Sequence, residues 1–310
     1  MIEIVAQSEA MREAVRLAER VAATDANVLV TGESGAGKDA LAFFIHSRST
    51  RAAEAFVKID CATLPSDLLE AELFGYERGA FTGANEAKPG RLEAAHRGTL
   101  VLDEIAYLSV DAQAKLLRVI EAREFERLGG RRTIKVDARL IALTNVDLAG
   151  AVERRNFRED LFYRLNVMHI HLAPLRERSE DLPELAQLFL RVYAAKHGRA
   201  LTGIAPDALA VLSQYEFPGN VRELANTLER AVIVATGKRI EESDLPISVR
   251  AAVLLNERRA RPRTLAEIER DYVAEILAAT NGNKAAAARI LGISRKNLYE
   301  RIARLRKDEG

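Results

Sequence analysis

Residues 28–39, VLVTGESGAGKD, combine residue types that can bind a phosphate group. Glycines let backbone N–H groups converge on an anion, a helix N-terminus adds partial positive charge, and Lys38 can reach the β and γ phosphates. The apolar run before the glycines predicts a buried parallel strand, and the apolar spacing after them predicts a helix. This context favours a nucleoside triphosphate site over the alternative, a glycine-rich turn with a surface lysine.

A second motif ends the apolar run of residues 100–104, LVLDE. Paired carboxylates at the end of such a strand lie at the edge of a parallel sheet where ligands bind. Asp103 would hold magnesium, directly or through water, and Glu104 would orient and polarise the attacking water. Such a ligand is needed because Asp39 stands where the general motif has a magnesium-binding Ser or Thr. The alternative is a strand that runs into an acidic helix cap.

Other polar residues could contact the phosphates of the same ligand. Thr144 and Asn145 end a predicted buried strand at residues 139–144, where they could read the γ-phosphate. Arg158 and Arg164 have planar, permanently charged guanidinium groups that suit phosphate recognition in trans. The alternative for both arginines is a solvated or salt-bridged side chain on a helix.

The segments that must position these groups alternate between strands and helices. Arg222 lies in the first turn of a helix for which we expect Asn220 as N-cap and Glu223 to complete a capping box, so it could reach back to the nucleotide. The apolar spacing predicts helices over 11–21, 64–74 and 112–121 and from 182 onward, a strand over 55–59, and a hairpin over 124–137 that turns at Gly129 and Gly130.

Composition limits the class of protein. At 310 residues the chain should hold about two or three domains, and 48% hydrophobic with 29% charged residues indicates a globular protein. No apolar run approaches the roughly 18 residues of a membrane span, and the N-terminus lacks a signal pattern, so we expect a cytoplasmic protein with no membrane partner. Cys61 is the single cysteine, which excludes an internal disulfide and a zinc site built on cysteine pairs.

The C-terminal part differs in charge from the rest. Residues 250–310 hold 14 Lys or Arg against 8 Asp or Glu, a net charge of +6, whereas the whole chain carries +1. A small-residue helix over 285–291, a turn with Gly292 and a basic third helix predict a helix-turn-helix that binds double-stranded DNA. The alternative is a basic three-helix module that binds protein. The third helix would begin at its cap and present these residues to DNA: Ser294, Arg295, Lys296, Asn297, Arg301 and Arg304.

The glycine-punctuated segment 75–90 has no lasting periodicity and places Phe81 and Thr82 between small residues. An aromatic residue at a loop tip suggests contact with a partner, while the alternative is that Phe81 folds back onto its own domain. From the residues alone, both interpretations stay open.

The motifs together resemble one family. The string GAFTGA, residues 79–84, is the most diagnostic feature of the bacterial enhancer-binding proteins, AAA+ ATPases that activate transcription by RNA polymerase carrying sigma-54. The chain resembles them from about Ile4 to its end. The resemblance implies an α/β AAA+ P-loop NTPase with a parallel sheet and a helical lid subdomain, followed by an all-α helix-turn-helix domain of the Fis type. It implies an ATPase subdomain at 1–173, a lid at 174–247, an arginine-rich linker at 248–263 and a DNA-binding domain at 264–310.

The resemblance also implies a role for each motif. The Walker A residues that bind ATP would be Gly32, Glu33, Ser34, Gly35, Ala36, Gly37, Lys38 and Asp39. The resemblance implies that Asp103 and Glu104 form the Walker B motif, with Asp103 binding Mg²⁺. It implies that Thr144 and Asn145 are the sensor I residues and that Arg222 is the sensor II residue. Arg158 and Arg164 would be the arginine fingers. The loop that contacts sigma-54 would consist of Gly79, Ala80, Phe81, Thr82, Gly83 and Ala84. The hairpin at Gly129 and Gly130 resembles a second, shorter loop that relays nucleotide state to the first.

Three features depart from the family pattern. Asp39 stands where the family usually has Glu, and both lack the magnesium-binding hydroxyl. Asp60 stands where many members have an Asn that pairs with the Walker B glutamate, and an aspartate would repel Glu104 unless one is protonated or metal-bound. The family's N-terminal regulatory domain is missing, as in members resembling phage-shock protein F that a separate protein controls in trans, or as in a longer protein from which it has been removed.

The implied function is activation of transcription. Enhancer-bound dimers would assemble into a ring, a hexamer, with ATP between subunits, and hydrolysis would move the GAFTGA loop to remodel the closed polymerase–promoter complex. A repressor or architectural DNA-binding protein whose nucleotide only controls oligomer state is an alternative that shares every motif except this loop. A helicase loader or chaperone would fit the ATPase core but gives no reason for GAFTGA.

Overall fold

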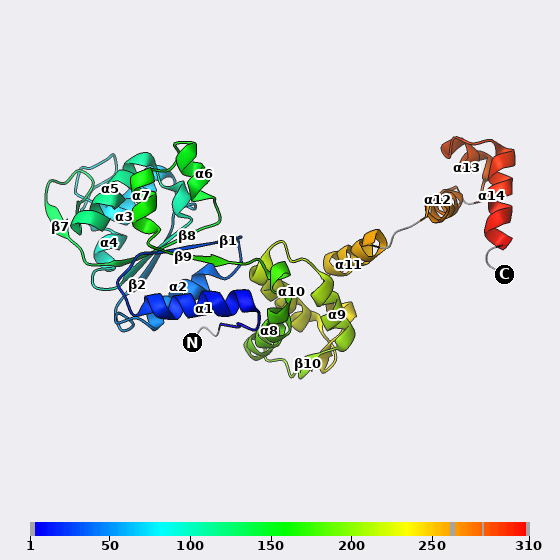
Figure 1. Ribbon diagram of the computed structural model, residues 1–310, viewed down its shortest axis with the longest axis horizontal. Coiled ribbons are helices and arrows are strands. Elements are labelled where there is room, and N and C mark those ends of the chain that lie inside the picture. The colour runs from blue at the N-terminus through cyan, green and yellow to red at the C-terminus, as the bar shows by residue number, and fades with distance from the viewer. Residues whose placement is uncertain (1–3, 261–263, 281, 308–310) are drawn as a thin grey trace. The chain divides into compact units, whose positions relative to one another are not determined.

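The computed structural model describes residues 4–260, 264–280 and 282–307 (Figure 1). The chain divides into two compact units, Met1–Arg250 and Ala251–Gly310. No helix among the described residues is long and apolar enough to cross a membrane.

A five-stranded parallel sheet forms the centre of the first unit. Its strands lie in the order β2 (Phe56–Asp60), β5 (Thr99–Asp103), β8 (Arg139–Thr144), β1 (Val28–Gly32) and β9 (Met168–Leu172). The four predicted strands are confirmed, whereas β9 was not predicted, because its histidines interrupt the apolar run. Since all five strands are parallel, the residues that end β1, β5 and β8 lie along the same edge of the sheet.

Helices cover both faces of this sheet (Figure 1). On one face lie α1 (Glu9–Ala22) and α2 (Lys38–Ser47); on the other lie α3 (Ser66–Phe74), α4 (Arg91–Ala94), α5 (Val110–Ala122), α6 (Leu148–Glu153) and α7 (Glu159–Leu165). Alternate side chains of β1 pack on opposite faces of the sheet. Val28 and Val30 belong to the core under α1 and α2, and Leu29 belongs to the core under α3 and α5. The predicted α/β class with a parallel sheet is thereby confirmed.

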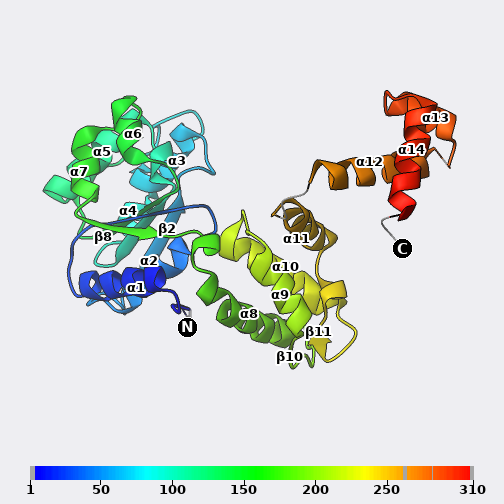
Figure 2. The same cartoon turned by 45° about the vertical axis from the view of Figure 1, so that its right-hand side comes forward.

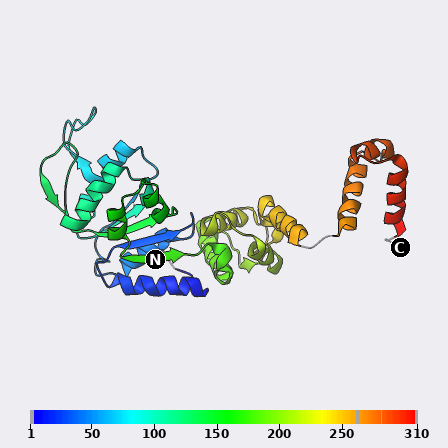
Figure 3. The ribbon, with the colours of Figure 1, turned by 45° about the horizontal axis from the view of Figure 1, so that its top comes forward.

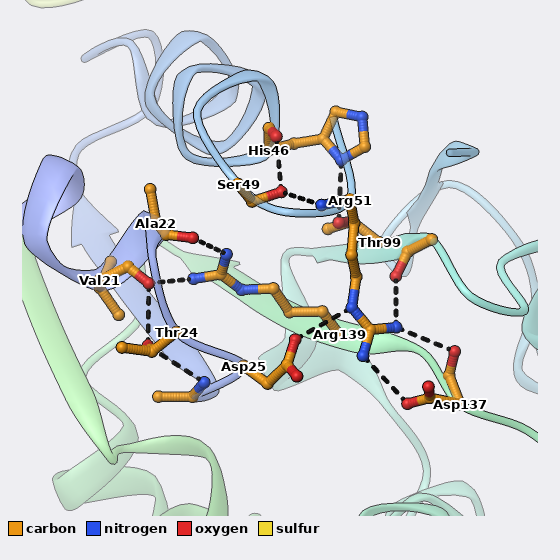
Figure 4. Close-up of polar contacts among 12 residues, drawn as sticks. Val21, Ala22, Thr24, Asp25, His46, Ser49, Arg51, Thr99, Asp137 and Arg139 are labelled. Carbon is orange, nitrogen blue, oxygen red and sulfur yellow. Dashed lines mark hydrogen bonds and ion pairs between the residues drawn. The ribbon is translucent and has the colours of Figure 1, made fainter. Parts of the chain in front are cut away.

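Two buried arginines fix the amino ends of the strands, opposite the candidate site (Figure 4). Arg139, only 2% exposed, donates to the carbonyl oxygens of Val21 at 2.8 Å and Ala22 at 3.2 Å. Arg51 donates to Asp25 at 3.0 Å. Because the last carbonyls of a helix have no partner within the helix, Arg139 satisfies the end of α1 and joins it to β8.

Two short antiparallel hairpins project from the sheet. Strands β3 (Gly75–Tyr76) and β4 (Lys88–Pro89) pair and close the segment that carries GAFTGA. Strands β6 (Glu124–Glu126) and β7 (Thr133–Lys135) form the second hairpin, which confirms the predicted turn.

The remaining part of the first unit is helical (Figure 2). It consists of α8 (Leu182–Lys196), α9 (Pro206–Gln214) and α10 (Asn220–Val234), with a two-residue parallel pair of β10 (Gly203–Ile204) and β11 (Arg239–Ile240). Three 3₁₀ turns belong to the same part, Leu175–Glu177, Ser179–Asp181 and Glu242–Asp244, whereas the turn Ile105–Tyr107 follows β5 in the sheet part. It has its own core, in which Leu190, Leu212, Phe217 and Leu228 are buried. This core matches the lid subdomain of the predicted fold class.

The prediction for the start of α10 is wrong in one respect. Asn220 is the first helical residue and Gly219 is the N-cap. The Asn220 side chain is fully buried and turns toward other segments instead of capping α10, while Glu223 accepts from the backbone N–H of Gly219 at 2.7 Å. Asparagine suits this position because its φ is +53°, in the left-handed region that asparagine tolerates better than most residues.

The second unit contains the predicted three helices (Figure 3). They are α12 (Leu265–Ala279), α13 (Lys284–Ile290) and α14 (Arg295–Lys307), around a small core that includes Val273, Ala287 and Leu298. The segment expected as an arginine-rich linker at 248–263 is instead helical through most of its length, in α11 (Ile247–Ala260). Residues 261–263 lie outside the described residues.

Candidate functional site

The phosphate loop joins β1 to α2 at the carboxyl edge of the sheet. Lys38, the first residue of α2, is 7% exposed and donates to the carbonyl oxygens of Gly32 at 2.8 Å and Glu33 at 3.2 Å. Its ammonium lies 3.9 Å from Oε1 of Glu104. Burial lowers the pKa of Lys38, and the charges of Glu104 and Asp103 oppose that shift. A cationic group is thus held inside the loop, next to the two predicted carboxylates.

The two carboxylates at the end of β5 have different partners. Glu104 has φ +52°, a left-handed conformation that directly follows the end of β5. Oε2 of Glu104 accepts from the backbone N–H of Asn145 at 3.2 Å. Asp60, the register partner of Asp103, accepts from the backbone N–H of Ala62 at 2.9 Å. Asp60 and Glu104, the two carboxylates expected to repel each other, therefore each accept from a different backbone N–H group.

Lys58 of β2 joins two other acidic residues at this edge. Its Nζ lies 2.7 Å from Oδ2 of Asp103 and also donates to Oδ1 of Asp39 in α2. Burial of Lys58 favours its neutral form, but the hydrogen bonds to Asp103 and Asp39 outweigh burial and raise the pKa of Lys58. Nothing in the sequence motifs had singled out Lys58.

Side chains of the lid form hydrogen bonds with side chains of the phosphate loop. Glu33 accepts two hydrogen bonds from Arg176, at 2.9 and 2.7 Å, and one from Nδ2 of Asn220 at 3.0 Å. These hydrogen bonds lower the pKa of Glu33 to about 2, and those from Arg176 contribute most. Nη1 of Arg222 donates to Oγ of Ser34 at 2.9 Å. The predicted reach of Arg222 toward the loop is thus present in the geometry.

The loop and the lid also meet through their backbones at Gly35. Its φ is +76°, and a Cβ atom at this position would lie 2.4 Å from the carbonyl oxygen of Gly219. Only glycine fits both the left-handed conformation and this close approach. The loop sequence is therefore matched to the start of α10 as well as to an anion.

Two adjoining hollows lie between the loop and the lid. The smaller, about 260 Å³, is lined by Lys38, Asp39, Asp103, Glu104 and Arg222 among others. The larger, about 600 Å³, is mostly apolar, and its lining includes Ile4, Val5, Leu188, Phe189, Tyr193 and Val221. Both are lined by Gly37, Ala40, Phe189 and Val221, so that a charged compartment continues into an apolar one. The apolar compartment was not predicted, because its residues come from the N-terminal segment and two lid helices.

The loop that carries GAFTGA forms a compact turn. The backbone N–H of Gly79 donates to the carbonyl of Ala84 at 2.8 Å, and that of Ala84 donates to the carbonyl of Phe81 at 3.0 Å. The Phe81 side chain is 41% exposed, and its ring meets that of Tyr76 edge-on, with centroids 5.0 Å apart. The two interpretations of Phe81 are both partly met, because one edge of the ring packs at the loop base and the rest faces outward.

The second hairpin contacts the base of this loop. The backbone N–H of Glu77 donates to the carbonyl of Leu128 at 3.0 Å, and Arg127 donates to Oε1 of Glu77 at 3.1 Å. A Cβ atom at Gly129, whose φ is +69°, would lie 2.9 Å from Ala80. The two loops therefore touch through backbone atoms, which makes any displacement of one felt by the other.

Comparison with known proteins assigns the family. Three family models match the chain: the Sigma-54 interaction domain over residues 4–171, the AAA+ ATPase lid domain over 176–261, and the Bacterial regulatory protein, Fis family, over 264–305. The chain belongs to the sigma-54-dependent transcriptional activators. Its resemblance to the bacterial enhancer-binding proteins is thereby confirmed.

Individual relatives agree with this family. Regulatory protein AtoC of Escherichia coli strain K12 is 45% identical over 307 residues, which cover 96% of this chain and 67% of AtoC. Transcriptional regulatory protein ZraR of Salmonella typhi is 44% identical over 301 residues, 97% of this chain and 68% of ZraR. The crystal structure of NtrX from Brucella abortus in complex with ATP superposes with a TM-score of 0.76 at 34% identity, covering 98% of this chain and 69% of NtrX.

Within this sigma-54 activator, the two sensor I residues lie differently. The Thr144 side chain is buried and accepts from the backbone N–H of Val146 at 3.0 Å, so that it shapes the turn after β8. The Asn145 side chain is exposed and lines another hollow of about 420 Å³ with His169 and His171. Only the backbone of Asn145 touches Glu104.

The two predicted arginine fingers do not line the charged hollow of their own chain. Arg158, the N-cap of α7, is bonded to both carboxylate oxygens of Asp160, at 3.0 and 2.7 Å. Arg164, at the other end of α7, pairs with Glu121 at 3.0 Å. Their side chains are 39% and 61% exposed. The salt-bridged alternative therefore describes them in the single chain.

The predicted DNA-contacting residues lie on or next to α14 of the activator. Oγ of Ser294 accepts from the backbone N–H of Asn297 at 3.2 Å, which is the predicted cap. Arg295, Lys296 and Asn297 are exposed. Arg301 is half-buried, because it pairs with Glu269 of α12 and donates to Oδ1 of Asn297. Arg304 lies in α14, and its side chain is outside the described part of the chain.

Sequence reasoning also missed a buried ion pair that joins three segments. Arg178 is 3% exposed and donates to the carbonyl of Ala36 in the phosphate loop at 2.5 Å. Its neighbour Asp181 lies 3.6 Å away and accepts from the backbone N–H groups of Gln7 and Ser8 at 2.6 and 2.7 Å. Burial lowers the pKa of Arg178, and Asp181 counteracts the shift. The only sequence signal for this ion pair was that Arg178 and Asp181, two residues of opposite charge, directly precede the helix predicted from residue 182.

Proposed function

We propose that the chain hydrolyses ATP and uses the energy to remodel sigma-54 RNA polymerase bound at a promoter, while its C-terminal domain holds enhancer DNA. The observation that carries this proposal is the charged hollow at Lys38 and Glu104, continuous with an apolar hollow between the loop and the lid. NtrX from Brucella abortus, which has been crystallised with ATP and with ADP, supports a nucleotide as the occupant.

The two hollows divide the ATP molecule between them. The apolar hollow takes the base, where Phe189 and Tyr193 offer aromatic surface. The phosphates meet the backbone N–H groups of the loop and the start of α2. Lys38 exchanges the carbonyl oxygens it now contacts for phosphate oxygens, and Arg222 provides a second cation from the lid.

The donors present fit a magnesium ion. Carboxylate oxygens are hard ligands, and Asp103 and Asp39 both face the charged hollow. Among the described residues no three His, Cys, Asp or Glu side chains gather closely enough to hold a metal by themselves, so phosphate oxygens and water must complete the shell. Bound Mg²⁺ would neutralise charge on the phosphates. Asp103 is the residue that would hold it, directly or through water.

Hydrolysis requires a base and charges at the γ-phosphate. Glu104 polarises the attacking water, and its contact with the backbone of Asn145 couples it to the turn after β8. Thr144 and Asn145 together sense the γ-phosphate. Arg158 and Arg164 act on the ATP of a neighbouring subunit in a ring, a hexamer formed from dimers; their exposure at both ends of α7 supports action in trans.

The polymerase contact follows from the two touching loops. The hairpin at Gly129 relays the nucleotide state to Ala80, and the exposed part of Phe81, with Gly79, Thr82, Gly83 and Ala84, contacts sigma-54. In this proposal the ATPase subdomain spans 1–173, the lid 174–247 and the DNA-binding domain 264–310.

One binding experiment tests the proposal. Core sigma-54 is mixed with the full chain in ADP plus aluminium fluoride, in ADP alone, and without nucleotide, and complexes are separated by native gel electrophoresis. We expect a stable complex with aluminium fluoride only, because that mimic of the transferring phosphoryl group needs the complete ATP site. Intact ATPase activity with no complex would overturn the proposal and favour a DNA-binding protein in which nucleotide only controls oligomer state.

A further inference from the structure

Lys58 connects two acidic residues that the phosphate site brings together from different elements. Asp39 belongs to the first turn of α2, Asp103 ends β5, and Lys58 reaches both from β2. Nζ of Lys58 is 2.7 Å from Oδ2 of Asp103 and also contacts Oδ1 of Asp39. The Asp103 side chain is only 15% exposed, so its charge is weakly solvated. One ammonium thus lies between two carboxylates that line the charged hollow.

We propose that Lys58 is a positioning residue that takes the place of the divalent cation: it holds Asp39 and Asp103 together in the metal-free protein and leaves them when the cation binds. This inference rests on the proposed function, because the cation is the one that accompanies ATP. It adds to that function a residue that sets how strongly nucleotide affinity depends on the divalent cation.

The other lysine of the site does not perform this task. Lys38 is directed to the carbonyl oxygens of Gly32 and Glu33 and lies nearest to Glu104 among the acidic residues. Without Lys58, therefore, Asp39 and Asp103 would face each other with no cation between them. Two carboxylates that contact the same ammonium lie close together, and like charges that are close repel strongly where water is partly excluded.

An ammonium and a magnesium ion cannot share the same carboxylate oxygens. Mg²⁺ needs oxygen ligands at about 2.0–2.1 Å in octahedral geometry, and a cation between Asp39 and Asp103 would displace Nζ of Lys58. Lysine suits this exchange because its charge sits on a flexible four-carbon stem. Lys58 is 36% exposed, so the hollow leaves it room to withdraw.

The charge of Lys58 has opposite consequences for the two forms of the nucleotide. It attracts the phosphates of metal-free nucleotide, since it raises the positive charge of the hollow. It opposes the metal complex, since the cation must displace an existing ion pair. A residue that merely stabilised the fold would change the affinity for both forms in the same direction.

The experiment measures nucleotide affinity without turnover. A fluorescent ADP analogue is titrated into the full chain, once in excess EDTA and once in excess MgCl₂, for the wild type and for Lys58→Met, which keeps most of the stem. The ratio of the dissociation constant in EDTA to that in MgCl₂ reports the coupling between metal and nucleotide. We expect Lys58→Met to raise this ratio on the order of tenfold, with weaker binding in EDTA.

Two further variants control this result. Lys58→Arg keeps the charge and should keep the wild-type ratio within about twofold. Lys115 is a matched lysine outside the site: its ammonium is 2.7 Å from Glu70, and it is 41% exposed. Lys115→Met should leave both dissociation constants unchanged. Circular dichroism checks folding, and Lys58→Gln replaces Lys58→Met if the latter does not fold.

The outcomes separate this inference from the proposed function. Equal weakening of binding in EDTA and MgCl₂ would make Lys58 a direct phosphate ligand and overturn the inference, as would an unchanged ratio. Both results would leave the ATP site intact. A wild-type chain that binds the analogue under neither condition would instead overturn the proposed function, and this inference with it.

Discussion

Nδ2 of Asn220 donates a 3.0 Å hydrogen bond to Oε2 of Glu33, across 187 positions of sequence. The same amide donates to the carbonyl of Ser34 at 3.1 Å, and its oxygen accepts from the backbone N–H of Leu175 at 2.7 Å. One fully buried side chain therefore ties the phosphate loop, the segment that leaves the sheet and the first turn of α10. Any movement of the lid relative to the loop must therefore break the hydrogen bonds from Asn220 to Glu33 and Ser34, or move the loop together with the lid.

Asn220→Ala should destabilise the first unit. The change leaves a buried N–H of Leu175 without its acceptor and places alanine in a left-handed conformation, so we expect a loss of about 2–3 kcal/mol. Urea unfolding followed by circular dichroism measures it. Asn226→Ala, at an exposed position of the same helix, is the control and should cost less than about 0.5 kcal/mol. Equal effects of the two substitutions would contradict this role for Asn220.

The contribution of Glu33 should depend on pH. Its pKa is lowered to about 2 in the folded chain by the hydrogen bonds from Arg176 and Asn220, against 4.5 for an unperturbed glutamate. A carboxyl group whose pKa falls on folding stabilises the protein above its unfolded pKa, and this stabilisation is lost as pH falls from about 4.5 toward 2. The effect is small, because the Glu33 side chain is 42% exposed and screened by water.

Comparing the wild type with Glu33→Gln checks this dependence. The difference between their free energies of unfolding should be constant from about pH 7 to 5 and should shrink below the unfolded pKa. Urea titrations at several pH values give both quantities. A difference that grows as the solution becomes more acidic would contradict the assignment.

Glu104→Ala should separate binding from turnover. We expect ATP to bind with an affinity close to that of the wild type, because Lys38 and the loop backbone remain. We expect kcat to fall by about 10² to 10⁴, the usual contribution of a group that activates water. Steady-state phosphate release and a fluorescent-nucleotide titration measure the two effects. Normal turnover would remove Glu104 from the mechanism.

Phe81→Ala should uncouple ATPase activity from transcription. The ring is 41% exposed and contacts Tyr76 at one edge, so its removal affects the loop tip without reaching the charged hollow. We expect ATPase activity to stay within about twofold of the wild type and open-complex formation, followed by permanganate footprinting, to be lost. Leu68→Ala removes another exposed apolar side chain, 50% exposed on α3, and should leave both activities intact. Normal activation by Phe81→Ala would contradict the sigma-54 contact.

Two arginines of α14 should differ in their effect on DNA binding. Arg295 is exposed, whereas Arg301 is paired with Glu269 and with Asn297. If Arg295 contacts a phosphate, Arg295→Ala weakens binding and reduces the slope of log K against log salt by about 0.9. Arg301→Ala should chiefly destabilise the three-helix unit, seen as a lower melting temperature of that unit. Electrophoretic shifts at several salt concentrations distinguish the two variants.

The local signals in the sequence were sufficient for most elements and for the motif residues. Strand β1, the glycines and α2 follow from apolar periodicity and from the conformations that only glycine adopts easily, because both are properties of neighbouring residues. Apolar spacing and helix caps likewise predicted three helices in the last 47 residues, and the charge of the last 61 residues predicted that this unit is basic. The recognition of the family rested on GAFTGA, a contiguous string.

Contacts between distant segments were decided by the tertiary structure. Lys58 looked like an ordinary residue of a half-buried strand, and only the pairing of β2 with β5 places it beside Asp103. Asn220 read as a helix cap, because its nearest neighbours fit a capping box, yet the approach of the lid gave its amide better partners in Glu33 and Leu175. Such choices depend on which buried polar groups come together in space, and spacing along the chain does not encode that.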